Sequence, residues 1–402
     1  MFKSLKRSKL LIFIFVAIFS GILIGLNVSG VAIDMFVALG SMLSTFISFF
    51  VPLIVIAFVT QGIVSMESSS GKILGFTVVI SYLFMFISAF AACFVGINFL
   101  GKFFSGGNIS SLGILNNSQS QINIFSNLPK IEVKPIVEVI PAIIISFVVG
   151  FGINLAGCET LKKVVNDFYK IIEIFVRKVI VSILPFYVLC TFVKLAASGK
   201  MMTIVQTFYK VFLIIIVLHL LSIFLQFLLA GLVSKRNPFI LLRNVIQLYL
   251  TCLATQSSVA MIPVALEAAR KNGVSEGVCR FVIPLCSTIH LTGSIISITS
   301  CSIAVMNISG YPVNFSIMVP FILSLGIMMI AAPGVPCGAI LAASSLFSSF
   351  LGFNPQMIAL MIALHVCQDG FGTACNVTGD NAIALIVDKL FYKNKSEFFS
   401  KS

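Results

Sequence analysis

Long apolar runs separated by short polar stretches dominate the chain. Its first 237 residues contain apolar spans near 10–27, 37–64, 74–100, 131–157, 164–195 and 203–232. A helix needs about 20 apolar residues to cross the hydrocarbon core of a bilayer, and each span is close to or above that length. The pattern therefore predicts an all-α polytopic protein embedded in the lipid bilayer.

From about residue 238 the apolar segments become shorter and are interrupted. Small and kinking residues break two of them, at 254–263 (ATQSSVAMIP) and 331–340 (AAPGVPCGAI). A longer apolar helix with its own polar break follows each, at 289–294 (IHLTGS) and 369–380 (DGFGTACNVTGD). Non-helical backbone at membrane depth is tolerated only inside protein or beside a water-filled cavity. We expect two re-entrant hairpins of inverted topology around one central site, a pattern typical of secondary transporters.

The last interruption places four polar side chains on one face of a helix. At 100° per residue, Thr373, Asn376 and Asp380 fall within about 40° of Asp369, with the two carboxylates about 16 Å apart along the axis. Each aspartate at a helix centre costs about 2.5–3.5 kcal/mol on insertion scales, so this face should point into the bundle. Such a stripe indicates a path or binding site for a cation and a polar solute. Polar residues that merely join helices are the alternative.

Composition agrees with a membrane protein, and the charges predict its orientation. The chain is 59% hydrophobic and 10% charged, with a mean hydropathy of +1.12, values that exclude a soluble domain. Its formal net charge of +13 comes from basic residues in alternate loops, whereas the loops near 27–35 and 306–318 carry none. This positive-inside asymmetry predicts a multi-pass protein of the plasma or inner membrane with both termini cytoplasmic. It requires no nucleic-acid partner.

Several motifs resemble the dicarboxylate/amino acid:cation symporter family. Residues 376–380 (NVTGD) match the signature of its last helix, and Ser257-Ser258 match its serine-rich first hairpin tip. The connection 271–277 (KNGVSEG) with 283–285 (IPL), and the second tip at Gly334-Val335-Pro336, are also similar. The resemblance is specific from about 238 to 390. It implies eight transmembrane helices, two re-entrant helical hairpins, a homotrimer and an elevator-type movement of a transport domain.

The same resemblance divides the chain into two parts. Residues 1–237 would form mainly the scaffold and trimerisation helices, the first six, with the third and sixth partly in the transport domain. Residues 238–402 would form the transport core. Within it we expect hairpin 1 at about 238–272, the seventh helix at about 278–308, hairpin 2 at about 312–350 and the eighth helix at about 355–391.

Departures from the family pattern indicate a neutral substrate. Members that carry acidic substrates have an arginine four residues before the signature asparagine, where this chain has Gly372. Gln256, rather than arginine, precedes the hairpin serines. A second substrate carboxylate would then be buried without a partner, at high cost. Gln368-Asp369 with Thr373 is similar to the serine/threonine:sodium symporter branch, although that branch usually has another residue at Gly372.

Chemistry and resemblance together assign the roles in substrate binding. Asp369 is expected to pair with the α-ammonium group of an amino acid. Asn376, the hydroxyl of Ser258 and nearby backbone amides should hold the α-carboxylate, and Thr373 a small polar side chain. The expected substrate-binding set is Ser257, Ser258, Val335, Asp369, Gly372, Thr373 and Asn376.

Na⁺ is the coupled ion that the resemblance implies. Asp380 is the expected oxygen ligand, helped by backbone carbonyls, because hard cations take oxygen ligands. A family site that needs an aspartate has Thr292 here, so we expect fewer coupled sodium ions than in glutamate transporters. The expected cation-binding set is Cys286, Thr288, His290, Asn376 and Asp380.

Other functions stay open at this stage. His290 and His365 lie in the interrupted segments, and a histidine in a membrane core is a possible proton relay. A symporter of acidic amino acids or dicarboxylates, and a channel-like or exchanging member of the same fold, are further alternatives. An enzyme is not expected, because the sequence shows no Ser-His-Asp order at plausible spacing, no metal-binding His/Cys cluster and no glycine-rich phosphate loop.

Overall fold

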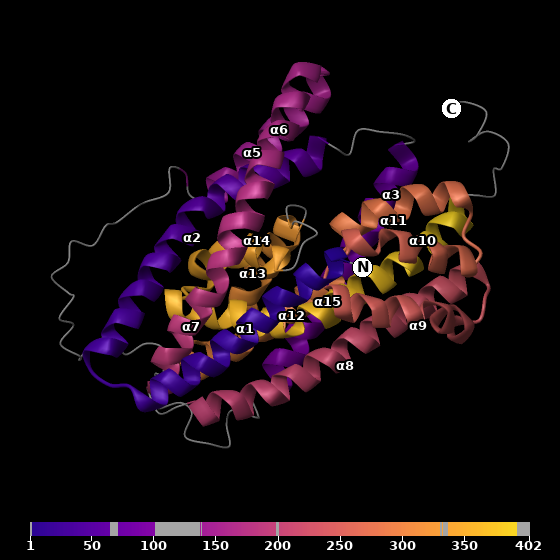
Figure 1. The fold of residues 1–402 in the computed structure, drawn as a ribbon. Helices are drawn as coiled ribbons and strands as arrows, with labels where there is room; N and C mark the ends of the chain where they lie inside the picture. Colours follow the sequence, from indigo (N-terminus) through magenta and orange to yellow (C-terminus); the bar gives the residue numbers. More distant parts are fainter. Residues whose placement is uncertain are drawn as a thin grey trace.

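Helices make up nearly all of the structure (Figure 1). The computed structural model describes residues 2–64, 71–100, 137, 139–197, 201–329, 332 and 337–391, and no strand occurs among these residues. A π-helical turn, Gly96–Leu100, extends α3, and another, Val176–Ile180, joins α6 to α7. The helices of the first part are α1 (Phe2–Asn27), α2 (Val31–Val64), α3 (Gly71–Val95), α5 (Val139–Ala156), α6 (Glu159–Phe175), α7 (Val181–Ala197) and α8 (Met201–Ser234).

The second part of the chain consists of shorter helices and one long one. The segment between α9 and α10 contains a single 3-10 turn, Val259–Met261, and two residues separate α11 from α12. The helices are α9 (Pro238–Thr255), α10 (Ile262–Lys271), α11 (Glu276–Ile289), α12 (Thr292–Ser309), α13 (Phe315–Met328), α14 (Gly338–Leu351) and α15 (Pro355–Phe391).

Local sequence signals explain where several of these helices begin and end. The Asn237 side chain accepts a hydrogen bond from the Phe239 amide (2.9 Å), and Pro238 opens α9, a common arrangement at helix starts. Asn314 likewise accepts from the Ile317 amide (3.0 Å) at the start of α13. α12 ends at Gly310, whose φ is +74°. Glycine adopts this left-handed conformation without a steric penalty.

Length and composition identify the helices that can cross a membrane. Four helical segments of the described residues qualify, namely Lys72–Leu100, Phe208–Ser234, Glu276–Ser309 and Pro355–Phe391. A fifth is possible if Glu159–Ile180 and Ser182–Ala197, bent by 40°, form one span. The continuous span expected near 164–195 is therefore bent. Shorter apolar helices accompany these, so the described residues support a polytopic membrane protein without fixing the expected total of eight spans.

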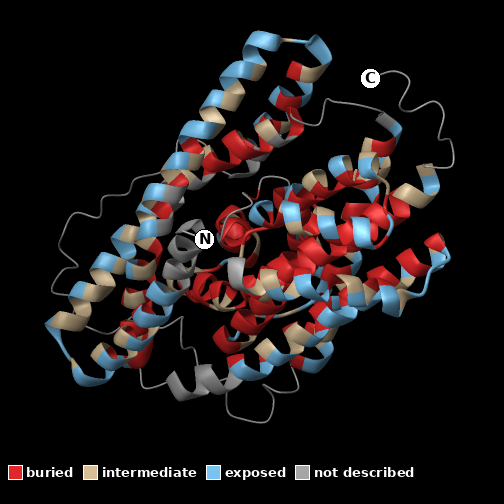
Figure 2. Cartoon of the chain, turned by 45° about the vertical axis from the view of Figure 1, so that its right-hand side comes forward, coloured by how far each residue is buried: buried red, intermediate tan, exposed pale blue. Residues whose placement is uncertain are grey.

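The protein interior is centred on α12 and α15. Every residue of α12 except Asn307 is buried, and α15 is buried along most of its length. Figure 2 shows the buried residues, in red, concentrated in the interior of the structure. α15 packs against α8, α9, α11 and α12, while α1 packs on α7 and α2 packs on α5 and α7. The outer helices expose apolar side chains, for example Leu155 at 89%. An apolar exposed surface of this kind suits contact with lipid.

Candidate functional site

The polar stripe of α15 is enclosed by protein. Asp369, Thr373, Asn376 and Asp380 are at most 6% exposed, as their common helix face requires. Three of the four make side-chain hydrogen bonds, and each of those three contacts a different part of the chain. The stripe therefore connects α15 with the start of α14, the start of α12 and the residues between α11 and α12.

Asp369 contacts the start of α14. Its Oδ2 accepts a hydrogen bond from the Cys337 amide at 2.9 Å, and Cys337 lies directly before α14 with a φ of +65°. The partial positive charge at a helix N-terminus stabilises a carboxylate in this position. The other oxygen, Oδ1, lies 3.6 Å from His365 Nε2, one turn earlier on α15. The Asp369 carboxylate thus contacts the start of α14 with one oxygen and lies close to the His365 imidazole with the other.

Asn376 caps the start of α12 from a different helix. Its Oδ1 accepts from the Gly293 amide at 2.7 Å and from the Ser294 amide at 3.4 Å. Its Nδ2 donates to Ser294 Oγ at 3.1 Å. The break after α11 leaves the first amides of α12 without intrahelical partners, and the amide oxygen of Asn376 satisfies two of them. The expected role of Asn376 at a substrate carboxylate stays a prediction, since these bonds already engage its side chain.

Asp380, His290 and Thr292 form a continuous hydrogen-bonded chain. His290 Nδ1 lies 3.0 Å from Asp380 Oδ1, and Thr292 Oγ1 lies 2.6 Å from His290 Nε2. All three side chains are 0% exposed. The second oxygen, Asp380 Oδ2, has no hydrogen-bond partner among the described residues. A buried carboxylate oxygen without a donor is a suitable ligand for a hard cation.

Two glycines allow α15 and α12 to approach closely. A Cβ at Gly293 would lie 2.3 Å from the Gly372 carbonyl oxygen and 2.7 Å from Cys375 Cβ. A Cβ at Gly372 would meet Gly293 C at 3.5 Å and Ser294 N at 3.6 Å, which is ordinary contact. Gly372 thus faces the backbone at the start of α12. The glycine that replaces an arginine of the family pattern also takes part in helix packing.

The first hairpin tip lies beside the same region of α15. Ser257 and Ser258 are 1% and 5% exposed, and Ser257 Oγ accepts from the Ala260 amide at 3.4 Å. A Cβ at Gly370 would lie 2.7 Å from the Leu253 carbonyl oxygen, so the end of α9 contacts α15 one residue after Asp369. The second hairpin tip, including the predicted residue Val335, lies outside the described residues.

Of the remaining predicted cation ligands, Cys286 is buried and Thr288 is exposed. The Cys286 carbonyl accepts from the His290 amide at 2.8 Å, at the end of α11 and four residues before His290. The Thr288 side chain is exposed, and its hydroxyl donates to the Leu285 carbonyl at 2.8 Å. The described residues hold no cluster of three or more His, Cys, Asp or Glu side chains suited to a metal ion. A cation bound in this region would therefore be held by oxygen ligands, from backbone carbonyls and from Asp380.

His219 is a member of this region that the sequence interpretation missed. Its Nε2 lies 2.9 Å from the Gly293 carbonyl oxygen and 3.2 Å from Ser297 Oγ, and the side chain is 0% exposed. The sequence contains three histidines, and all three are buried in the described structure. The sequence did contain a signal for it. His219 is a lone histidine within the apolar 34-residue helix α8, and polar residues at membrane depth are costly and therefore often functional.

The hydrogen-bonded chain of Asp380, His290 and Thr292 predicts losses of stability of different size for two substitutions. We expect His290→Ala to lower the free energy of unfolding by roughly 1–3 kcal/mol, because it leaves Asp380 Oδ1 buried without a donor. Thr292→Val should have a smaller effect, since it removes only the outer bond. Thermal unfolding of the purified variants in detergent measures both. A larger loss in Thr292→Val than in His290→Ala would contradict this order.

Comparisons with known proteins agree with this architecture. The sodium:dicarboxylate symporter family profile matches residues 10–390. The serine/threonine transporter SstT of Acinetobacter baylyi is 32% identical over 166 residues, which are 40% of this chain and 42% of that protein. Human excitatory amino acid transporters 1 and 5 are 29% and 28% identical over 164 and 179 residues, covering 30% and 31% of their lengths. The chain thus matches less than half the length of each of these relatives.

Proposed function

The chain belongs to the sodium:dicarboxylate symporter family, and on this premise we propose that it is a sodium-coupled symporter of a small neutral amino acid, serine or threonine. Membership of a transporter family implies a multi-pass membrane protein and a small-molecule substrate rather than an enzymatic reaction. The proposal includes a homotrimer in the plasma or inner membrane with cytoplasmic termini. It also includes elevator-type movement of the transport core, residues 238–402.

The absence of arginine from the last 122 residues of the sequence supports a neutral substrate. Arg280 is the last arginine in the sequence, so α12, α13, α14 and α15 contain none. Gly372, the position where acidic-substrate members of the family carry arginine, faces the backbone of Gly293 and Ser294. Asp369 supplies an anion for the substrate ammonium, whereas a second substrate carboxylate would find no guanidinium to pair with. This observation carries the proposal, and the serine/threonine transporter among the relatives agrees with it.

The Asp380 carboxylate supports a cation site in the same region. Its Oδ1 is held by His290, and its Oδ2 has no partner among the described residues. Na⁺ prefers oxygen ligands, and the Cys286 carbonyl, which accepts from the amide of His290, is a further oxygen at the end of α11. The residues present therefore fit an alkali cation as the co-transported ion.

Uptake by the purified protein in liposomes tests the proposal. Labelled serine, threonine, aspartate and glutamate are offered with an inward sodium gradient, with an inward proton gradient, and without a gradient. We expect concentrative uptake of serine or threonine that requires sodium. Equal uptake of aspartate would overturn the neutral substrate, uptake driven by protons alone would overturn sodium coupling, and gradient-independent equilibration would indicate a channel or exchanger.

Asp380→Asn is expected to weaken sodium binding and, by linkage, substrate binding. Sodium and substrate that favour each other's binding do so by the same factor, so loss of the carboxylate should reduce both. The measurement is sodium-dependent thermal stabilisation together with serine affinity at several sodium concentrations.

Asp388→Asn is the matched control, because Asp388 lies on the same helix and bonds the Ser275 amide at 3.0 Å, away from the proposed cation. Sodium dependence should survive in this control. If Asp380→Asn also retains wild-type sodium dependence, the cation binds elsewhere.

A further inference from the structure

His365 is a buried histidine whose ring has no hydrogen-bond partner. Its side chain is 1% exposed, and neither Nδ1 nor Nε2 bonds to any of the described residues. The other two histidines differ, because His219 contacts the Gly293 carbonyl oxygen and His290 contacts Asp380. Buried polar groups nearly always have partners, and a buried group without one is costly. The unpaired ring of His365 therefore indicates a partner that does not belong to these parts of the chain.

The Asp369 carboxylate leaves one oxygen open beside this ring. Its Oδ2 accepts a hydrogen bond from the Cys337 amide at 2.9 Å, whereas Oδ1 accepts none from the described residues and lies 3.6 Å from His365 Nε2. This distance is too long for a hydrogen bond between the two side chains. Residues four apart in a helix are neighbours on one face, so the open oxygen and the ring nitrogen lie side by side.

The spacing of these two atoms fits a single ammonium nitrogen. They are 3.6 Å apart, so a nitrogen at the usual hydrogen-bond distance of about 2.9 Å from each would have them about 77° apart. The N–H bonds of an ammonium group diverge by about 109°, so each would point about 16° away from its acceptor, which keeps the angle at hydrogen above 150°. A neutral imidazole with its proton on Nδ1 offers Nε2 as the acceptor.

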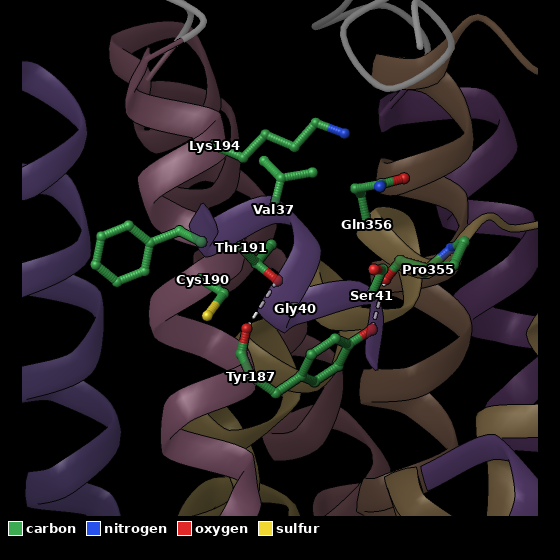
Figure 3. Close-up of a pocket in the computed structure, with 10 residues that line it drawn as sticks. Val37, Gly40, Ser41, Tyr187, Cys190, Thr191, Lys194, Pro355 and Gln356 are labelled. Atoms are coloured by element: carbon green, nitrogen blue, oxygen red, sulfur yellow. Dashed lines mark hydrogen bonds between the residues drawn. The ribbon is translucent and has the colours of Figure 1, made fainter. Parts of the chain in front are cut away.

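Contacts on both sides of this pair fix α15. Near its start, Tyr187 of α7 donates a hydrogen bond of 2.6 Å to the Pro355 carbonyl oxygen (Figure 3). Beyond Asp369, the Asn376 side chain accepts from an amide at the start of α12 at 2.7 Å. The pocket in Figure 3 lies beside the first of these bonds and is lined by neither His365 nor Asp369. A helix held in this way presents the two acceptors with little rearrangement on binding.

We propose that His365 Nε2 and Asp369 Oδ1 together bind the primary ammonium group of the substrate, which makes His365 a further specificity-determining residue. The carboxylate balances the charge, and the imidazole accepts a second N–H that would otherwise be buried without an acceptor. The inference rests on the proposed function in so far as the substrate is an amino acid. It applies to neutral and acidic amino acids alike, because both carry this ammonium group.

Opposite effects on stability and on binding distinguish this role from a structural one. In His365→Phe a ring without a partner is replaced by an apolar ring, so the thermal midpoint without substrate should stay unchanged or rise. Serine affinity, measured by calorimetric titration at saturating sodium, should fall roughly tenfold to a hundredfold, as expected for loss of a hydrogen bond to a charged group. His365→Gln supplies another acceptor and should retain most of the affinity.

The matched control is the same substitution at the second buried histidine. His219 Nε2 lies 2.9 Å from the Gly293 carbonyl oxygen, so His219→Phe removes an existing contact and should lower the thermal midpoint. A fall of the midpoint in His365→Phe as large as in His219→Phe would show that His365 supports the fold. Unchanged serine affinity in His365→Phe would also overturn the proposal.

Alanine identifies the substrate group that His365 contacts. It has the ammonium group of serine but no hydroxyl, so His365→Phe should weaken both amino acids by the same factor. A loss for serine alone would assign His365 to the hydroxyl instead. If wild type binds aspartate rather than serine, the neutral-substrate proposal fails, and the same comparison with aspartate decides the role of His365. Binding of succinate, which has no amine, without binding of any amino acid would overturn both proposals.

Discussion

Asp369→Asn is expected to abolish measurable binding of the amino-acid substrate while the protein remains folded. Removing one partner of a buried ion pair typically costs about 3–5 kcal/mol, which corresponds to a factor of roughly 100 to 4,000 in Kd. The asparagine oxygen can still accept from the Cys337 amide, which lies 2.9 Å from Asp369 Oδ2, so the contact with α14 should persist. Isothermal titration with serine and threonine, at saturating sodium, measures the loss.

The control for this prediction separates charge from shape. Asp369→Glu keeps the carboxylate but lengthens the side chain, and we expect weakened rather than abolished binding. Both variants should show wild-type sodium-dependent stabilisation in the absence of substrate if Asp380 holds the cation. Near-normal uptake by Asp369→Asn would show that another group binds the substrate ammonium.

Gly293→Ala should destabilise the protein more than any other single methyl addition in this region. The new Cβ would lie 2.3 Å from the Gly372 carbonyl oxygen and 2.8 Å from Gly372 Cα. Both atoms belong to the backbone of α15, so helix displacement is needed to relieve the clash. Overpacking a core costs about 1–3 kcal/mol, occasionally more, and we expect a value at the upper end. The thermal midpoint and the yield of folded protein measure it.

Gly372→Ala is the matched control on the facing helix. Its Cβ would meet its nearest neighbours at 3.5–3.7 Å, which requires no movement, and alanine favours a helix by about 1 kcal/mol over glycine. We expect unchanged or slightly raised stability. Comparable destabilisation by both substitutions would show that α12 and α15 do not pack as closely as the structure describes.

Local signals explain which features could be predicted from the sequence. The NVTGD motif, together with the motifs of the two hairpins and of the connection at 271–277, indicated the family, which the match over residues 10–390 confirms. Helical periodicity placed Asp369, Asn376 and Asp380 on one face, and all three are buried. Both inferences depend on residues close together in the chain. For the common face, helix geometry fixes the directions in which these side chains point.

Partners that come from other helices could not be predicted in the same way. The sequence did not indicate that the Asn376 side chain accepts hydrogen bonds from two amides at the start of α12. The partner depends on the position of the break between Ile289 and Thr292 relative to α15, which is a tertiary relation. His219 was missed for a similar reason, because its helix α8 is uninterrupted and only packing brings it to the Gly293 carbonyl.

The bond between α14 and Asp369 is unusually resistant to mutation from one side. Its donor is the main-chain N–H of Cys337, which every amino acid except proline possesses. Proline is also excluded, because its ring fixes φ near −65° whereas Cys337 has a φ of +65°. Substitutions at position 337 that preserve the backbone can therefore vary the thiol without deleting the contact. Genetic variation can remove this bond directly only through Asp369, so during evolution the attachment of α14 cannot be lost at this bond without also losing the charge that α15 presents to a solute, although asparagine can remove the charge alone.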